Sequence, residues 1–186
     1  MSDIPKYLPL SQRPRRDESG VTGDWAPRLS AVLEVLAGLV EKDETARDGV
    51  ARLIWMLRAD RRSRLSAAIA RKSPRALTDD PAAALRSISS ETGRKRPLRD
   101  LANAVIVTLD VASASQRAVH LDAVSLGAVA VARALSAPLP IRAVLADVTL
   151  VASDGDWAVG RGPERTAPGA AIVLFLYGRT GLPVTE

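Results

Sequence analysis

The sequence predicts a mainly α protein, in which a four-helix bundle is followed by a small α/β module made of a hairpin and a helix. Two observations predict this fold class. Apolar residues recur at helical spacing in several segments of residues 29–135, whereas they alternate over residues 141–152, as in a strand. The stretch 136–140 between the two patterns contains two prolines, which stop a helix. We therefore expect a mobile basic arm at residues 1–23, the helical bundle at 24–137 and the α/β C-terminal domain at 138–186.

The chain has 186 residues, a net charge of +5 and no cysteine. Without cysteine it has no disulfide framework, thiolate metal ligand or cysteine nucleophile, and a reducing cytoplasm is the expected location. No run reaches the ~18 apolar residues of a membrane span, so we expect no membrane partner. The aromatic residues are too few and too scattered to stack bases, so we do not expect nucleic-acid binding despite the basic charge. The oligomeric state stays open.

Several segments of the first half have the start signals and apolar spacing of helices. A helix is expected over residues 24–42, with Asp24 as its capping residue, and a second one begins at Thr45. Beyond Arg58 the pattern turns polar, so the second helix either continues as a solvated helix or breaks and restarts. A loop over residues 71–80 and a short helix over residues 81–88 follow.

The most apolar helix-like segment is Leu98–Val111, LRDLANAVIVTLDV. Its branched residues leave a buried strand over VIVTLDV as an alternative, but the spacing of its apolar residues favours a helix. Asn103 and Val107 stand four residues apart and therefore share one face of that helix. We expect the helix to lie inside the bundle, because it is apolar on nearly every side.

The C-terminal half adds one helix and the small module. Residues 119–135 have helical spacing, and Asp154-Gly155-Asp156 is a turn that a strand at Trp157–Val159 follows, so a hairpin is expected. A final helix over Pro168–Tyr177 is apolar enough to lie across this hairpin.

Three parts of the sequence, in their order along the chain, resemble segments of one family. They are Thr45–Ile54 (TARDGVARLI), Leu98–Val111, and the C-terminal pair Leu150–Pro163 (LVASDGDWAVGRGP) and Phe175–Arg179 (FLYGR). These segments are similar to the mycothiol-dependent maleylpyruvate isomerase family, a branch of the DinB-like helical-bundle metalloproteins, and the C-terminal match is the most specific. The resemblance implies a four-helix bundle with a small α/β C-terminal domain.

The resemblance also implies a divalent metal, usually zinc, that activates a low-molecular-weight thiol. Its ligands would be a histidine in the first segment and a pair of groups four residues apart in the second, which fall here on Arg52, Asn103 and Val107. Arginine stays protonated, valine has no donor atom and asparagine alone is a weak oxygen ligand. We therefore expect no metal and no cofactor, and zinc and mycothiol belong only to the alternative function below.

Arg52 is then expected to point into the pocket that the metal would occupy. A buried guanidinium needs a partner, and Asp110, about one helical turn from Val107, is the nearest acidic residue. Two interpretations stay open. Arg52 and Asp110 form an ion pair, joined by Asn103, that plugs the former site, or Arg52 binds a small anionic ligand such as a carboxylate.

Other candidate residues carry weaker signals. His120 is the only histidine and is interpreted as a surface residue. Asp154 and Asp156 are interpreted as parts of a turn rather than as an acid pair. The glycine-rich stretch 160–163 lacks the strand–loop–helix context of a phosphate site.

Two functions are compatible with these residues. The first is a metal-free, non-catalytic member of the family that serves as a binding or scaffold protein. The alternative is a thiol-dependent isomerase or transferase with an atypical metal site. Stoichiometric zinc in protein purified without chelator would favour the alternative.

Overall fold

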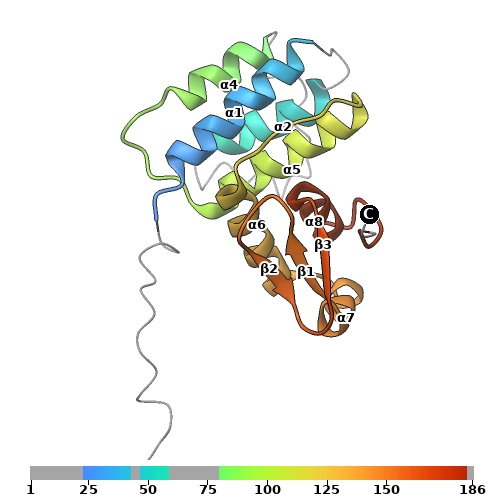
Figure 1. Cartoon of the computed structure of the whole chain (residues 1–186). Coiled ribbons are helices and arrows are strands. Elements are labelled where there is room, and N and C mark those ends of the chain that lie inside the picture. The colour runs from blue at the N-terminus through green and yellow to red at the C-terminus, as the bar shows by residue number, and fades with distance from the viewer. Residues whose placement is uncertain (1–22, 43–46, 59–79, 184–186) are drawn as a thin grey trace, which may run out of the picture.

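The computed structural model describes residues 23–42, 47–58 and 80–183 (Figure 1). In these ranges the chain forms seven helices and one three-stranded sheet, so it is mainly helical with a small β part, as predicted. The predicted arm, except residue 23, lies outside the described residues. So do the predicted start of the second helix at Thr45, the question of a break after Arg58 and the loop before Asp80.

The first four described helices are α1 (Ala26–Val40), α2 (Arg47–Arg58), α4 (Pro81–Ser89) and α5 (Leu98–Ala114). Both α1 and α2 pack against α4 and against α5, so the four helices share one apolar core. A side-chain cap sets the start of α4, where the Asp80 carboxylate accepts a hydrogen bond from the Ala83 amide at 3.0 Å. In α1 the residue at the cap is Trp25, and the predicted capping residue, Asp24, lies one position earlier and accepts a hydrogen bond from the Ala26 amide at 3.0 Å.

The central segment is one continuous helix, α5, and the alternative of a buried strand is wrong. Ten of its 17 residues are buried, including two that are polar or charged, Asp100 and Thr108. The Thr108 hydroxyl donates to the carbonyl of Ala104 at 2.8 Å, which satisfies the buried oxygen inside the helix itself.

Helix α6 (Ala123–Ser136) begins four residues later than predicted, because Asp122 caps it. The Asp122 carboxylate accepts hydrogen bonds from the amides of Val124 and Ser125, at 3.1 and 3.0 Å. Residues 115–122 instead form a connector between α5 and α6, and Figure 1 shows this connector running alongside α1.

The prediction of a strand from Ile141 onward is wrong for its first part. Residues Leu139–Asp147 form a helix, α7, and the strand β1 begins only at Thr149. Pro140 lies in the first turn, where proline favours a helix, and the apolar residues of this segment fit a helical period as well as an alternating one. No single helix of the described residues is long and apolar enough to cross a membrane; α6 and α7 together pass that test by length and composition, but they meet at a bend of 110°.

The sheet has the strand order β2-β1-β3, with β1 at Thr149–Ala152, β2 at Ala158–Gly160 and β3 at Glu164–Ala167. The antiparallel pair β1 and β2 confirms the predicted hairpin, in which Leu150 lies opposite Val159. The parallel strand β3 was not predicted, because only its last residue, Ala167, is buried and its sequence, ERTA, has no apolar alternation. Helix α8 (Gly169–Leu176) confirms the predicted final helix and packs against β1.

Two glycines allow the chain to cross from β2 to β3 past the end of α7. Gly160 and Gly162 both have a φ of +106°, a conformation that side chains rarely adopt. A Cβ atom at Gly160 would lie 2.1 Å from the Val148 carbonyl oxygen, and one at Gly162 would lie 2.5 Å from that of Asp147. The glycine-rich stretch therefore has a structural role in this connection.

Candidate functional site

Arg52 lies on the exposed side of α2, and the expectation that it points into a pocket is wrong. The buried residues of this helix include Val50 and Ile54, and Arg52 stands two positions, about 200°, from each of them. The apolar stripe of α2 therefore turns Arg52 away from the core. This stripe is visible in the sequence, so the direction of Arg52 could have been predicted.

The predicted ion pair between Arg52 and Asp110 is not formed either. Asn103, Val107 and Asp110 do share one partly exposed side of α5, as their spacing predicts. On that side, however, a carboxylate oxygen of Asp110 lies 3.0 Å from the guanidinium of Arg179, which follows α8. The acidic partner proposed for Arg52 is thus occupied by a residue from the C-terminal end of the chain.

The residues at the family's ligand positions do not fit a metal. Their donor chemistry is wrong, as the sequence indicates, and Arg52 is turned outward. Among the residues that the structure describes, no group of three or more histidine, cysteine, aspartate or glutamate side chains is placed to hold a metal ion.

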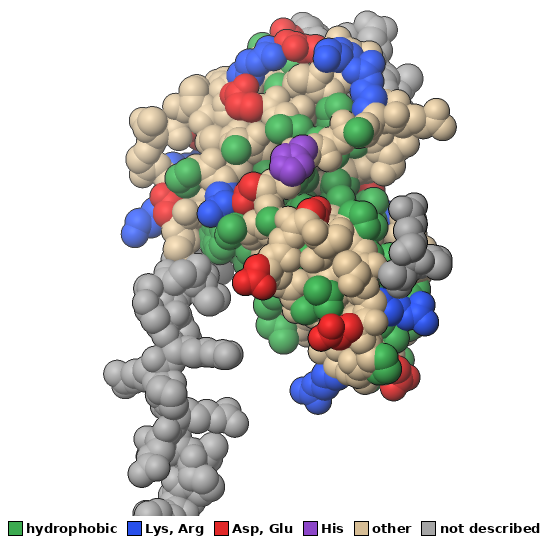
Figure 2. Space-filling model, viewed as in Figure 1, with side chains coloured by type: hydrophobic (Ala, Val, Ile, Leu, Met, Phe, Trp, Pro, Cys, Tyr) green, Lys and Arg blue, Asp and Glu red, His purple; other side chains and the backbone are tan. Residues whose placement is uncertain are grey.

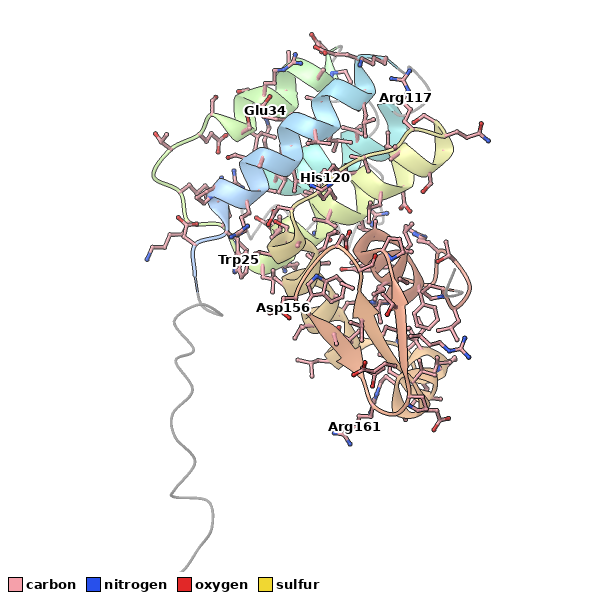
Figure 3. The ribbon with its side chains drawn as sticks, viewed as in Figure 1. Trp25, Glu34, Arg117, His120, Asp156 and Arg161 are labelled. Atoms are coloured by element: carbon pink, nitrogen blue, oxygen red, sulfur yellow. The ribbon has the colours of Figure 1, made fainter. Side chains whose placement is uncertain are left out.

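A surface hollow of about 660 Å³ lies between the C-terminal half of α1 and the connector. Figure 3 shows Arg117 and His120 on the connector and Glu34 on α1, and in Figure 2 the histidine lies amid hydrophobic side chains. We call this feature the α1 hollow. Its lining residues are Glu34, Val35, Gly38, Leu39, Lys42, Arg117, Ala118, Val119 and His120.

The connector is held at the C-terminal end of α1. The Arg117 amide donates to the carbonyl of Ala112 at 2.9 Å, directly after Gln116, whose φ of +50° turns the chain back from α5. The guanidinium of Arg117 lies 3.5 Å from the carbonyl oxygen of Lys42, just past the end of α1. A cation at this position complements the partial negative charge of the helix end, so the sequence places Arg117 there for a local electrostatic reason.

Among the described residues that line the α1 hollow, Glu34 supplies the one carboxylate, and it has partners on α4. It accepts a hydrogen bond from the Ser89 hydroxyl, and its other oxygen lies 3.7 Å from the Arg86 guanidinium. Arg86 also bonds Glu41 at 2.5 Å, and this hydrogen bond lowers the pKa of the Glu41 carboxyl. Glu34 and Glu41 are thus paired with Arg86, so Lys42 and Arg117 are the unpaired charges among the described residues around the hollow.

The floor of the α1 hollow is apolar and has free space. Leu39 and Val35 of α1 and Val119 of the connector supply apolar surface. Gly38 lies among them, and a Cβ atom built there would have no atom within 4 Å. Exposed Lys42, Arg117 and His120 surround this floor. The arrangement can hold a small molecule that has an apolar body and a negative group.

A second charged cluster, at Arg96, is structural and was missed in the sequence. The Arg96 side chain is only 4% exposed, and it donates to the Leu57 carbonyl at the end of α2 and to the Glu91 carboxylate, at 2.9 and 2.8 Å. Its guanidinium also lies 3.7 Å from the buried carboxylate of Asp100. The (i, i+4) spacing of Arg96 and Asp100 was the available signal, although nothing local shows that both are buried.

The two aspartates of the hairpin turn do not form an acid pair with a shared role. The Asp154 carboxylate accepts a hydrogen bond from the Gly169 amide at 2.8 Å and so holds the start of α8. Asp156 is exposed. Trp157 packs against Gly127 of α6 and Gly169 of α8, where added Cβ atoms would come within 2.8 Å of its ring. The interpretation of this segment as a turn is confirmed.

No protein-family model, no curated protein and no solved structure matches this chain significantly. The resemblance of the three sequence segments therefore stays a prediction, and the function has to be argued from the residues themselves.

Proposed function

We propose that this protein is a metal-free, non-catalytic relative of the mycothiol-dependent maleylpyruvate isomerase family that binds a small organic anion. Three sequence segments support the relationship. The mutual packing of α1, α2, α4 and α5, followed by a small α/β part, is compatible with the DinB-like four-helix bundle that the family would have. The substituted ligand positions favour binding without metal chemistry.

The charge of the α1 hollow is the observation that carries the proposal. Lys42 and Arg117 provide two full positive charges, and the His120 ring adds a hydrogen-bonding group. The opposing carboxylate, Glu34, is engaged by Arg86 and Ser89. An anion is thus attracted from solution and meets donors whose one carboxylate neighbour in the described lining, Glu34, is already engaged.

The apolar floor narrows the ligand class. Val35, Leu39 and Val119 offer contacts to a hydrocarbon body, and the open space above Gly38 leaves room for it. The hollow, of about 660 Å³, is open toward solvent, so it would cover one side of a small ligand rather than enclose it. A medium-chain monocarboxylate matches both features, whereas the exposed Arg52 offers a charge with no hollow around it.

Hexanoate and its neutral analogue hexanamide test this proposal. We expect hexanoate to shift the backbone amide NMR signals of Gly38 and Val119, saturably and with a salt-sensitive affinity, and hexanamide to shift them much less. Equal shifts with both compounds, or shifts confined to residues outside the hollow, would contradict it. Metal analysis of protein purified without chelator is the companion measurement, and one zinc per chain would support the enzyme alternative instead.

Gly38 allows a matched pair of variants. Gly38→Leu places a side chain in the free space without a clash and should abolish hexanoate binding. Gly38→Ala makes a similar change to the backbone but fills little of the hollow, so binding should persist. Both replace a glycine within a helix and should keep or raise the stability by about 0.5–1 kcal/mol, so a loss of binding in Gly38→Leu alone reports occlusion rather than unfolding.

A further inference from the structure

Helix α6 is apolar on all sides, yet only one side of it is covered by the described residues. Its inner side packs against α5, α8 and β2, and Leu126 and Val129 are buried there. Its single charged residue, Arg133, also faces inward, because Nε donates to the Leu176 carbonyl at 3.1 Å and the guanidinium stacks on the Tyr177 ring, 4.7 Å from its centre. A helix that is apolar all round is normally buried all round.

The outer side of α6 carries a continuous row of exposed apolar residues. Val124, Val131 and Leu135 are spaced by seven and four residues, so they lie on one line with Ala128 between them. They are 55%, 47% and 82% exposed, and Leu139, four residues beyond at the start of α7, is 75% exposed. No other large hydrophobic side chain is as exposed in the described part of the chain. We call Val124, Ala128, Val131 and Leu135 the α6 stripe; Leu139 lies just past its C-terminal end, where α7 turns away by 110°.

Opposite charges flank the two ends of the α6 stripe. The hairpin turn lies beside the N-terminal end of α6, where a Cβ atom at Gly155 would be 2.8 Å from that of Ala123, and the next residue, Asp156, is exposed. Past the C-terminal end, exposed Arg142 stands three residues after Leu139 on α7 and so on the same side of that helix. Arg161, whose amide donates to the Leu145 carbonyl of α7, also lies near this end, as does the exposed Asp147, so the two arginines leave this end with a net positive charge. Figure 3 shows Arg161 well apart from Asp156.

We infer that the α6 stripe is the interface of a two-fold symmetric dimer in which two copies of α6 pack antiparallel. A two-fold axis pairs each surface with itself, and an antiparallel arrangement places the acidic end of one stripe against the basic end of the other. It also opposes the two helix dipoles favourably. An uncharged middle with opposite charges at its ends is complementary to its own copy in this orientation.

The size of the α6 stripe sets the strength of the dimer. The distance from Val124 to Leu135 along the helix is about 17 Å, and a helix is about 10 Å wide. This face is smaller than the roughly 800 Å² per partner of a standard stable interface, so the dimer should dissociate at micromolar concentration. The inference does not depend on the proposed anion site, because the two surfaces share no residue.

Sedimentation velocity of the full chain over a range from low micromolar to submillimolar concentration tests the inference. The average mass should rise from the 19.7 kDa of the monomer toward twice that value. Leu135→Lys should keep the protein monomeric throughout, whereas Ser136→Lys, which adds the same charge one position off the line, should still dimerise. A monomer at every concentration, or a dimer that Leu135→Lys does not weaken, would overturn the inference.

A charge exchange tests the antiparallel orientation. Asp156→Arg and Arg142→Asp should each weaken dimerisation by roughly three- to tenfold, because each places like charges together twice in a two-fold dimer. The double variant should restore the wild-type affinity. Failure of the double variant to restore it would overturn the antiparallel arrangement. Binding of monomeric protein to lipid vesicles that Leu135→Lys abolishes would assign the stripe to a membrane surface and also overturn the dimer.

Discussion

Replacement of Arg96 by methionine should destabilise the protein strongly. Methionine keeps an apolar stem in the same space but removes every donor, so the Leu57 carbonyl and the carboxylates of Glu91 and Asp100 lose the guanidinium. A charged hydrogen bond to a buried carbonyl contributes about 1.5–3 kcal/mol, and breaking a buried pair costs about 3–5 kcal/mol. Glu91 is partly exposed, so water can replace part of its pairing with Arg96. We therefore expect the unfolding free energy to fall by about 3 kcal/mol, the lower limit for breaking a buried pair.

Urea unfolding followed by circular dichroism measures this loss, and a thermal scan should show the midpoint lower by about 6–12 °C for a chain of this size. Arg94→Met is the matched control. Arg94 is exposed in the same link, so this change should alter the unfolding free energy by no more than about 0.5 kcal/mol. If Arg96→Met is no less stable than Arg94→Met, the buried guanidinium does not join α2 to the start of α5 as we describe.

Three further predictions concern stability and ionisation. Gly160→Ala should lower the thermal midpoint, because its Cβ atom would strike the Val148 carbonyl oxygen and φ is positive. Ultraviolet titration, with the other tyrosine replaced by phenylalanine, should give Tyr177 a pKa above its ordinary value because of burial. Arg133→Met should raise that pKa further, because Arg133 opposes the effect of burial. Hydrogen bonds from backbone amides lower the pKa of Asp24, so the stability that its carboxylate contributes is present above about pH 4 and is lost as the pH falls through the lowered pKa. The difference in unfolding free energy between wild type and Asp24→Asn should therefore shrink in acid. A difference that stays constant with pH would contradict this prediction.

Helix starts were predicted well where a capping side chain and a proline act within one turn. Pro81 and the carboxylate of Asp80 define the start of α4 without help from any other part of the chain. The same local chemistry was misjudged at Asp122, where helical spacing suggested an earlier start. Residues 141–147 were misjudged because their apolar residues fit both periods, and the early Pro140 decides for a helix.

The candidate site was less predictable than the helices. The exposed direction of Arg52 follows from the apolar stripe of its own helix, so that error was one of interpretation. The pairing of Asp110 with Arg179 and the burial of Arg96 against Leu57 join residues far apart in the chain. No local pattern contains such pairings, because they depend on which helices become neighbours.

The sequence by itself determined the mainly helical class, the hairpin, most helix starts and the lack of metal-ligating groups at Arg52, Asn103 and Val107. These properties follow from propensity, capping and donor chemistry, which act over a few residues. Only the tertiary structure decided where a ligand or a partner could bind. The α1 hollow exists because the connector runs alongside α1, and the α6 stripe stays exposed because α5, α8 and the sheet cover one side of that helix alone.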